Sequence, residues 1–234
     1  MTGESGMEHK GLPDLSVNGV SDAVGGKYGN VRIDGVIKVV GDIEAQSFKL
    51  NGVVRTTGSV KSESFECDGT LKVAGSLSAG SMLMNGLVNV EGALSGERLL
   101  LNGLLTIKGD CEFEHVEGEG GFDVDGLLNA GSINLKLQGR GKAREIGVES
   151  LHIRQGTKSL WSKVWKWLFP KFSPELRAGV IEGDDIDVEY TKADVIRGNR
   201  VVIGKGSVIG RVEYKSELKV LPGATIGERV KTGG

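Results

Sequence analysis

Apolar and polar residues alternate along most of this chain, a pattern that is typical of β-strands and not of helices. Ile37, Val39 and Ile43 stand at odd positions, whereas the next apolar residues, Phe48 and Leu50, stand at even ones. A corner between two strands produces such a change, because after the bend the even positions face the core in place of the odd ones. We therefore expect two or three short strands wrapped around a narrow apolar core.

The same pattern returns every 17 residues, as from Gly35 to Gly52. Glycine marks this 17-residue period in two series, which are Gly35, Gly52, Gly69, Gly86, Gly103 and Gly120, and Gly41, Gly58, Gly75, Gly92, Gly109 and Gly126. A fixed period of about this length is the signature of a solenoid, in which each repeat stacks on the next. Asn or Asp precedes most glycines of the first series and favours a tight corner. No proline falls between positions 14 and 169, as expected for strands that are paired on both sides. The sequence predicts an all-β parallel β-helix.

The repeat extends beyond its regular part in both directions. Gly19 and Gly25 keep the spacing of the two glycine series, so we expect the first coil to begin near Val17. Val201 lies one full period before Leu218, which indicates that the coils resume near the C-terminus. The predicted division is a flexible tail at residues 1–16, a β-helix body at 17–153, an insertion at 154–178, further coils at 179–230 and a tail at 231–234.

The amino-acid composition argues against several classes of function. The 29 basic and 31 acidic residues leave a net charge of −2, which gives no general attraction for nucleic acid. No run approaches the length of a membrane-spanning helix, and the first residues lack the apolar region of a signal peptide. Cys67 and Cys111 occupy inward positions three turns apart, about 14 Å by the spacing of strands, which is too far for a disulfide. Two buried thiols fit a reducing compartment, so we expect a cytoplasmic protein.

The insertion has a different character from the rest of the chain. It holds all three tryptophans and predicts a short amphipathic helix at residues 158–172. Its apolar face is formed by Trp161, Val164, Trp165 and Leu168, and its cations include Lys158, Lys163 and Lys166. Such a helix suits the surface of a membrane, where Arg140, Lys142, Arg144 and Arg154 would add attraction for anionic lipid. Packing on the solenoid and docking to a partner protein are the alternatives.

No arrangement of residues predicts catalysis. None of the three histidines has a second ligand at metal-binding spacing. The glycines at residues 204–207 lack the spacing of a phosphate-binding loop. Residues 203–210 and 224–227 resemble hexapeptide acyltransferases, but those enzymes keep a strict six-residue period and a catalytic histidine. We expect no enzyme, metal, cofactor or small-molecule substrate.

Outward positions also carry apolar residues. Stacking places four leucines near one corner of adjacent coils, and these are Leu83, Leu87, Leu100 and Leu104. A contiguous apolar stripe predicts a lateral protein contact, with cover by the 158–172 helix as the alternative.

The ends of a β-helix present unpaired strand edges. The last coil contains Val220, Leu221 and Ile226, and only Pro222 and a few charges blunt it. End-to-end pairing would satisfy such edges and produce a filament. The alternative is that the short tails keep the ends soluble.

The segment GGKYGNVRIDG at residues 25–35 and the Gly-x5-Gly turns that follow it through Leu135 resemble the bactofilins, a family of polymer-forming bacterial cytoskeletal proteins. The resemblance implies a right-handed β-helix that assembles without nucleotide into non-polar filaments through its terminal coils. It also implies a scaffold, often at the inner membrane, that positions envelope machinery. The chain departs from the family in its extra coils, its short tails and its Trp-rich insertion.

Two functions follow as expectations. The first is a self-assembling cytoplasmic scaffold, peripheral to the membrane through residues 158–172, whose partners are itself and envelope or motility proteins. The second is a non-polymerising adaptor that binds a protein through the leucine stripe.

Overall fold

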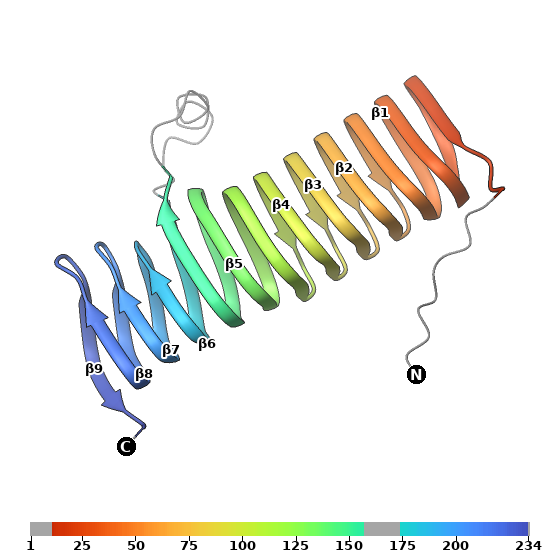
Figure 1. Cartoon of the computed structure of the whole chain (residues 1–234). Helices are drawn as coiled ribbons and strands as arrows, with labels where there is room; N and C mark the ends of the chain where they lie inside the picture. Colours follow the sequence, from red (N-terminus) through yellow and green to blue (C-terminus); the bar gives the residue numbers. More distant parts are fainter. Residues whose placement is uncertain (1–10, 157–173, 234) are drawn as a thin grey trace, which may run out of the picture.

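The computed structural model describes residues 11–156 and 174–233, which form one elongated β-solenoid (Figure 1). Its elements are β1 (Leu15–Thr56), β2 (Val60–Val73), β3 (Leu77–Val90), β4 (Leu94–Ile107), β5 (Cys111–Gln155), β6 (Glu175–Val188), β7 (Thr191–Ile203), β8 (Val208–Val220) and β9 (Thr225–Lys231). All pair in chain order in one parallel sheet. β1 and β5 are 42 and 45 residues long and wind through more than one coil. The all-β parallel β-helix is therefore confirmed.

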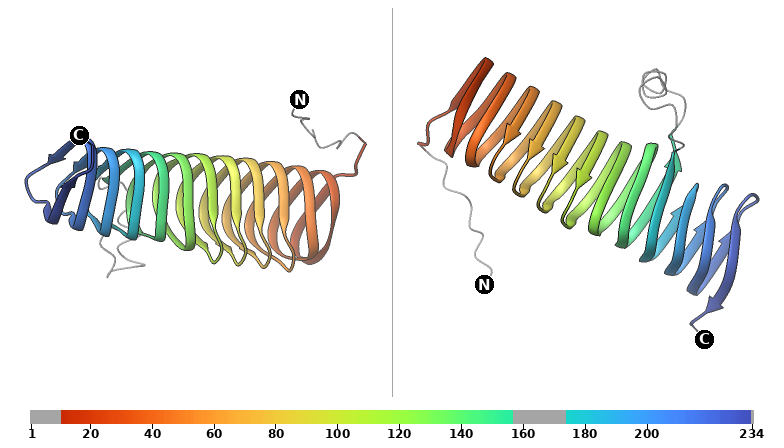
Figure 2. Two further views of the ribbon diagram at one scale, coloured as in Figure 1. Left: turned by 90° about the horizontal axis from the view of Figure 1, so that it is seen from below. Right: turned by 180° about the vertical axis from the view of Figure 1, so that it is seen from behind.

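Strand register follows the period of the sequence in the regular coils. Ile43 pairs with Val60, and Val60 pairs with Leu77, so each coil advances the chain by one 17-residue period. Two further views show the coils stacked in a row, with β1 at one end of the rod and β9 at the other (Figure 2). Identical sequence positions therefore form columns along the rod.

Coil length changes after β5. Leu176 pairs with Thr191, and Asp185 likewise pairs with Arg200 across a sequence separation of only 15. In the next coil Arg197 pairs with Glu213 through a hydrogen bond, across a separation of 16. The register then shifts between Gly198 and Arg200, and the step of the regular coils returns. Shortened coils explain why the repeat is hard to recognise in the sequence of β6 and β7.

The core consists of the predicted inward columns. Phe48 and Phe65 are at most 2% exposed and stack with ring centroids 5.4 Å apart. A further buried column was not predicted, because it is made mostly of small residues that carry little hydrophobic signal. Its buried members are Ala45, Ser62, Ala79, Phe113 and Ala130.

Stacked glycines form one corner of the solenoid. Gly52 and Gly69 have φ angles of +127° and +145°, a conformation that favours glycine. A Cβ on Gly69 would lie 2.1 Å from the carbonyl oxygen of Gly52. Beside this column, the side chain of Asn85 donates a hydrogen bond to Asp68 at 2.8 Å and accepts one from Asn102 at 3.0 Å. The predicted corners therefore stack one above another.

The boundaries of the predicted segments need correction. β1 begins two residues before the predicted start at Val17, and β9 extends to Lys231, inside the predicted tail. The predicted insertion at 154–178 is too wide, because β5 continues to Gln155 and β6 begins at Glu175. Both ends of the predicted insertion therefore belong to the solenoid. The helix predicted at 158–172 lies outside the described residues.

The insertion interrupts one coil whose remaining length is close to that of the regular coils. Arg140 pairs with Glu175, 35 positions later. Without residues 157–173 the two would be 18 positions apart, which is one more than the regular 17-residue period. Throughout the described ranges, no helix has the length and apolar character needed to cross a bilayer.

Candidate interaction surfaces

The C-terminal end of the rod leaves part of a strand edge open. β9 pairs with β8 from Val208 to Tyr214, and no strand in the described part of the chain covers β8 beyond that point, apart from a bond from Thr232 to Tyr214. Parallel edges of this kind are sites for the addition of another strand.

Apolar side chains at this end are only partly covered. Leu218 and Val220 stack on Val201 and Ile203, but they are half-buried where the residues beneath them are fully buried. The three residues that the sequence predicted for end-to-end assembly, Val220, Leu221 and Ile226, all lie in this last coil and are all half-buried.

At the opposite end, hydrogen bonds tie the first coil to the second. The carboxylate of Asp14 accepts hydrogen bonds from the backbone and side-chain nitrogens of Asn30, at 2.7 and 3.0 Å. The carbonyl oxygen of Pro13 accepts a bond from the backbone of Gly29 at 2.9 Å. These contacts join the first coil to the second, and the inward residues Leu15 and Val17 of the first coil are half-buried, so this end of the rod is partly open as well.

The four leucines of the predicted stripe are brought together. Leu83 pairs with Leu100 and Leu87 pairs with Leu104 in adjacent coils. Leu87 and Leu100 are 37% and 42% exposed, while the other two are half-buried. The glycine corner separates the pairs, so the leucines lie on two adjoining sides of the rod.

A groove that the sequence analysis missed runs beside Leu83 and Leu100. It has a volume of about 550 Å³ and crosses five coils. One wall is a column of polar side chains, namely Ser47, Ser64, Ser81, Arg98 and His115. The serines recur at the 17-residue period, so their spacing was a signal that could have indicated this wall.

A second groove, of about 690 Å³, lies over β5 to β8 near the C-terminal end. Gly147, Gly183 and Gly198 contribute to its lining. Arg197 lies in this groove and forms an ion pair with Glu213 at 3.0 Å.

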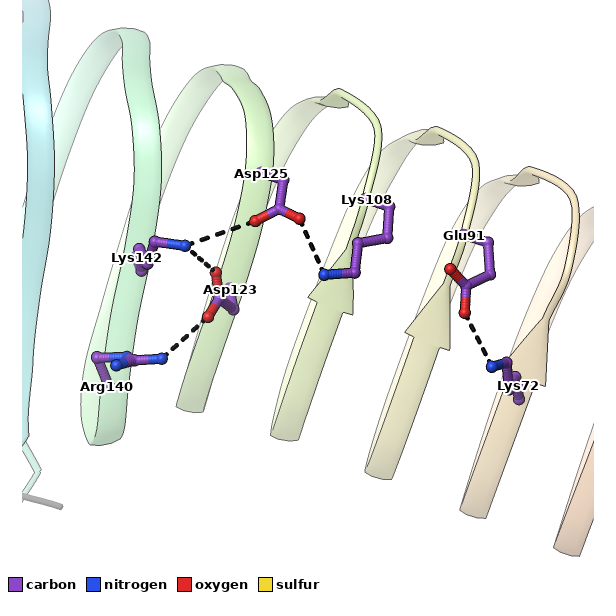
Figure 3. A network of polar contacts seen from close by, with 7 residues as sticks. All are labelled: Lys72, Glu91, Lys108, Asp123, Asp125, Arg140 and Lys142. Atoms are coloured by element: carbon purple, nitrogen blue, oxygen red, sulfur yellow. Dashed lines mark hydrogen bonds and ion pairs between the residues drawn. The ribbon is translucent and has the colours of Figure 1, made fainter. Parts of the chain in front are cut away.

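Charges on the outer surface pair between neighbouring coils (Figure 3). Lys108 contacts Asp125 at 2.9 Å, and Lys142 contacts both Asp123 at 3.0 Å and Asp125 at 3.5 Å. Hydrogen bonding and the positive charge of Lys108 lower the pKa of Asp125, and Lys142 contributes in the same direction. The partners belong to adjacent coils, so these pairs link one coil to the next.

The same pairing changes the role predicted for the cations before the insertion. Arg140 and Lys142 contact Asp123, and Arg154 contacts Asp187. Their charges are compensated by acidic neighbours, so they are poor candidates for attracting lipid.

Both cysteines are buried in the core and unpaired. Burial, with a smaller effect of the neighbouring Asp68, raises the pKa of the Cys67 thiol to about 12. Burial raises the pKa of the Cys111 thiol to about 12 as well. Thiols with such values remain protonated at neutral pH and are weak nucleophiles.

The other predicted contact residues cannot be placed. Lys158, Trp161, Lys163, Val164, Trp165, Lys166 and Leu168 lie outside the described residues. Among residues 11–156 and 174–233, no group of three or more His, Cys, Asp or Glu side chains is arranged to hold a metal ion.

Two bacterial proteins are similar to part of this chain. Uncharacterized protein YhbE of Bacillus subtilis (strain 168) is 39% identical over 111 residues, which cover 46% of this chain and 44% of that protein. Uncharacterized protein YhbF of the same strain is 35% identical over 107 residues, which cover 45% of this chain and 42% of that protein. The chain thus spans less than half the length of the curated relatives that it matches. No family model matches the chain, and no solved structure matches it.

Proposed function

We propose that this protein is a self-assembling scaffold whose solenoids join end to end without a nucleotide. The observation that carries the proposal is the last coil, where half of β8 has an open edge in the described structure and the apolar core is only partly covered. A coil from another molecule would pair with this edge and bury Leu218, Val220 and Ile226. The resemblance to bactofilins in the repeated turns supports the same function.

Electron microscopy of the purified protein at physiological salt, without nucleotide, tests this proposal. We expect filaments a few nanometres wide. The double variant Val220→Arg/Ile226→Arg should prevent them, because two cations would be buried in the joint. Val208→Arg is the matched control, since Val208 is 49% exposed on the side of the same coil.

Comparing the unmodified protein with the double variant and the control variant separates a loss of assembly from a loss of folding. Circular dichroism should show the same β-structure in all three proteins. Short uniform rods from the unmodified protein at tens of micromolar would contradict end-to-end assembly and favour the adaptor. The adaptor is supported by the exposed Leu100, which lies beside Leu83 at the serine-lined groove.

We also propose that residues 158–172 attach the rod to an anionic membrane surface, positioning envelope machinery there. The support is the tryptophan and lysine pattern of the segment, which leaves and re-enters the solenoid between Gly156 and Pro174. Flotation with vesicles that contain an anionic lipid is the test. Trp161→Glu with Trp165→Glu should abolish binding, and binding that persists unchanged would remove the membrane proposal.

A further inference from the structure

Four asparagines of this chain are followed directly by glycine, and all four lie at the glycine corner. They are Asn18, Asn51, Asn85 and Asn102. An asparagine loses its side-chain amide most easily before glycine, because glycine has no side chain to hinder attack by its own backbone nitrogen. The fold places the four sites in different surroundings, so we expect their reactivities to differ.

Three of the four side chains are held in the ladder beside the glycine corner. Asn51 donates a hydrogen bond to Asp34. Asn85 donates one to Asp68 at 2.8 Å, and Asn102 donates one to Asn85 at 3.0 Å. Each of these carboxamides is therefore fixed on a residue of the preceding coil.

The glycines that follow these three asparagines are enclosed by coils on both sides. A Cβ on Gly52 would meet the carbonyl oxygen of Gly35 at 2.2 Å, and one on Gly69 would meet that of Gly52 at 2.1 Å. Gly86 and Gly103 continue the same stack. Attack on the asparagine requires the backbone at the corner to rotate, and this close packing opposes the rotation.

Asn18 lies in the first coil, at the red end of the rod in Figure 1, where both restraints are weaker. Its side chain is exposed and makes no hydrogen bond with any described residue. Gly19 has a φ of +87°, and a Cβ on it would meet nothing within 4 Å. Gly35 of the second coil lies on one side of Gly19, and no described coil lies on the other. This corner is therefore held from one side only.

We propose that Asn18 is a site of spontaneous deamidation in the folded protein, whereas the glycine corner protects the other three sites. The backbone nitrogen of Gly19 attacks Cγ of Asn18, so a bond from this nitrogen to Cγ forms and the bond from Cγ to Nδ2 breaks. Ammonia leaves and takes the proton of the backbone nitrogen. Water then opens the resulting cyclic imide at one of its two carbonyl carbons, and the product is aspartate or isoaspartate.

Either product weakens the packing of the first coil. Because Gly19 and Gly35 stack, the residues before them, Asn18 and Asp34, are also neighbours. Aspartate at position 18 brings a second carboxylate beside that of Asp34. Isoaspartate lengthens the main chain at the corner by one methylene group and so displaces the first coil from the second.

The first coil is one of the two ends that join in the proposed assembly, so deamidation should limit joining at this end. This consequence rests on the proposed function, but the modification itself does not. The two are therefore measured separately.

Mass spectrometry of the full-length protein tests the modification. Trypsin places the four sites in separate peptides, which are residues 11–27, 50–55, 73–98 and 99–108. During incubation of the folded protein in warm, slightly alkaline buffer, Asn18 should lose its amide at least about tenfold faster than each of the other three, the factor that release of about one hydrogen bond supplies. Isoaspartate should appear beside aspartate in the first peptide, which distinguishes the cyclic-imide route from direct hydrolysis.

The unfolded chain is the control for the role of the structure. In guanidinium chloride the ladder and the glycine stack are lost, so the four sites should react at similar rates. Equal rates in the folded protein, or a preference for Asn18 that persists unchanged in the unfolded chain, would overturn the proposal.

Asn18→Ser, which cannot deamidate, tests the consequence for assembly. Filaments of the unmodified protein should shorten as the protein ages, whereas those of the variant should not, and equal shortening of both would contradict an effect at this end. If fresh unmodified protein forms no filaments, the end-to-end proposal fails, but the mass spectrometry still decides the modification.

Discussion

Among single residues, the members of the glycine corner meet the strictest demands in this solenoid. Gly52, Gly69 and Gly86 have positive φ angles and also lie directly on the backbone of the preceding coil. A side chain at such a position would meet both conformational strain and a steric clash. Not every glycine of the solenoid is constrained in this way. A Cβ on Gly139 would only reach Leu104 Cδ2 at 3.6 Å, which is ordinary contact.

Gly69→Ala is therefore expected to destabilise the protein strongly. The new Cβ would lie 2.1 Å from the Gly52 carbonyl oxygen, at a φ of +145°. The expected loss is about 3 kcal/mol of unfolding free energy, measured by denaturant titration. Gly139→Ala should change it by less than about 0.5 kcal/mol, and similar losses for the two variants would contradict this account of the corner.

Between strands, neighbouring coils are joined by hydrogen bonds, side-chain ladders and ion pairs at one-coil spacing. Hydrogen bonding to Arg200 and the positive charge of that residue lower the pKa of Asp185, and Lys108 and Lys142 lower that of Asp125. These carboxylates are exposed, so each pair contributes little by itself. Because the pKa values of both carboxylates are lowered, the effect of acid on the stability of the fold can be predicted.

Acid should weaken the solenoid through these carboxylates. A pKa that is lower in the folded protein than in the unfolded chain stabilises the fold above the unfolded value, which is about 3.9 for Asp. That contribution is lost as the pH falls through the lower, folded value. Thermal unfolding midpoints should therefore drop between about pH 5 and about pH 3.

Asp125→Asn provides the comparison for this pH effect. The variant should start from a lower or equal midpoint at neutral pH and should lose less on acidification than the unmodified protein. An identical pH profile for the two proteins would show that the pairs made by Asp125 contribute nothing to stability.

In the described residues, the whole rod has a partly open coil at each end and one interrupted coil. The interruption falls within a coil whose length is otherwise close to normal, since removal of residues 157–173 brings Arg140 and Glu175 to within one residue of the regular spacing.

Deletion of residues 157–173 should consequently leave the solenoid intact. We expect an unchanged β-type circular dichroism spectrum, an unchanged thermal midpoint within a few degrees and unchanged filaments. Binding to anionic vesicles should be lost. A large drop in the midpoint would instead indicate that the segment packs on the solenoid, which is the alternative that the sequence left open.

The fold and most of the core could be predicted from the sequence alone. Inward columns such as Ile43, Val60 and Leu77 can be read directly, because a buried strand face imposes apolar residues at a period of two and the stacking of coils imposes the repeat. The glycine corner was equally clear, since only glycine fits it. These constraints act on each repeat separately, so they leave a mark in the linear pattern.

The remaining features required the three-dimensional arrangement of the coils. The shortened coils, the narrower insertion and the ion pairs of Arg140 and Arg154 depend on which residues lie in the next coil. The exposed residues Val20, Val36 and Val53 likewise lie side by side only because the glycines before them stack in adjacent coils. Outward positions are solvated, so the fold does not require them to be apolar or polar. The sequence therefore does not show which outward residues are neighbours until the register of the coils is known.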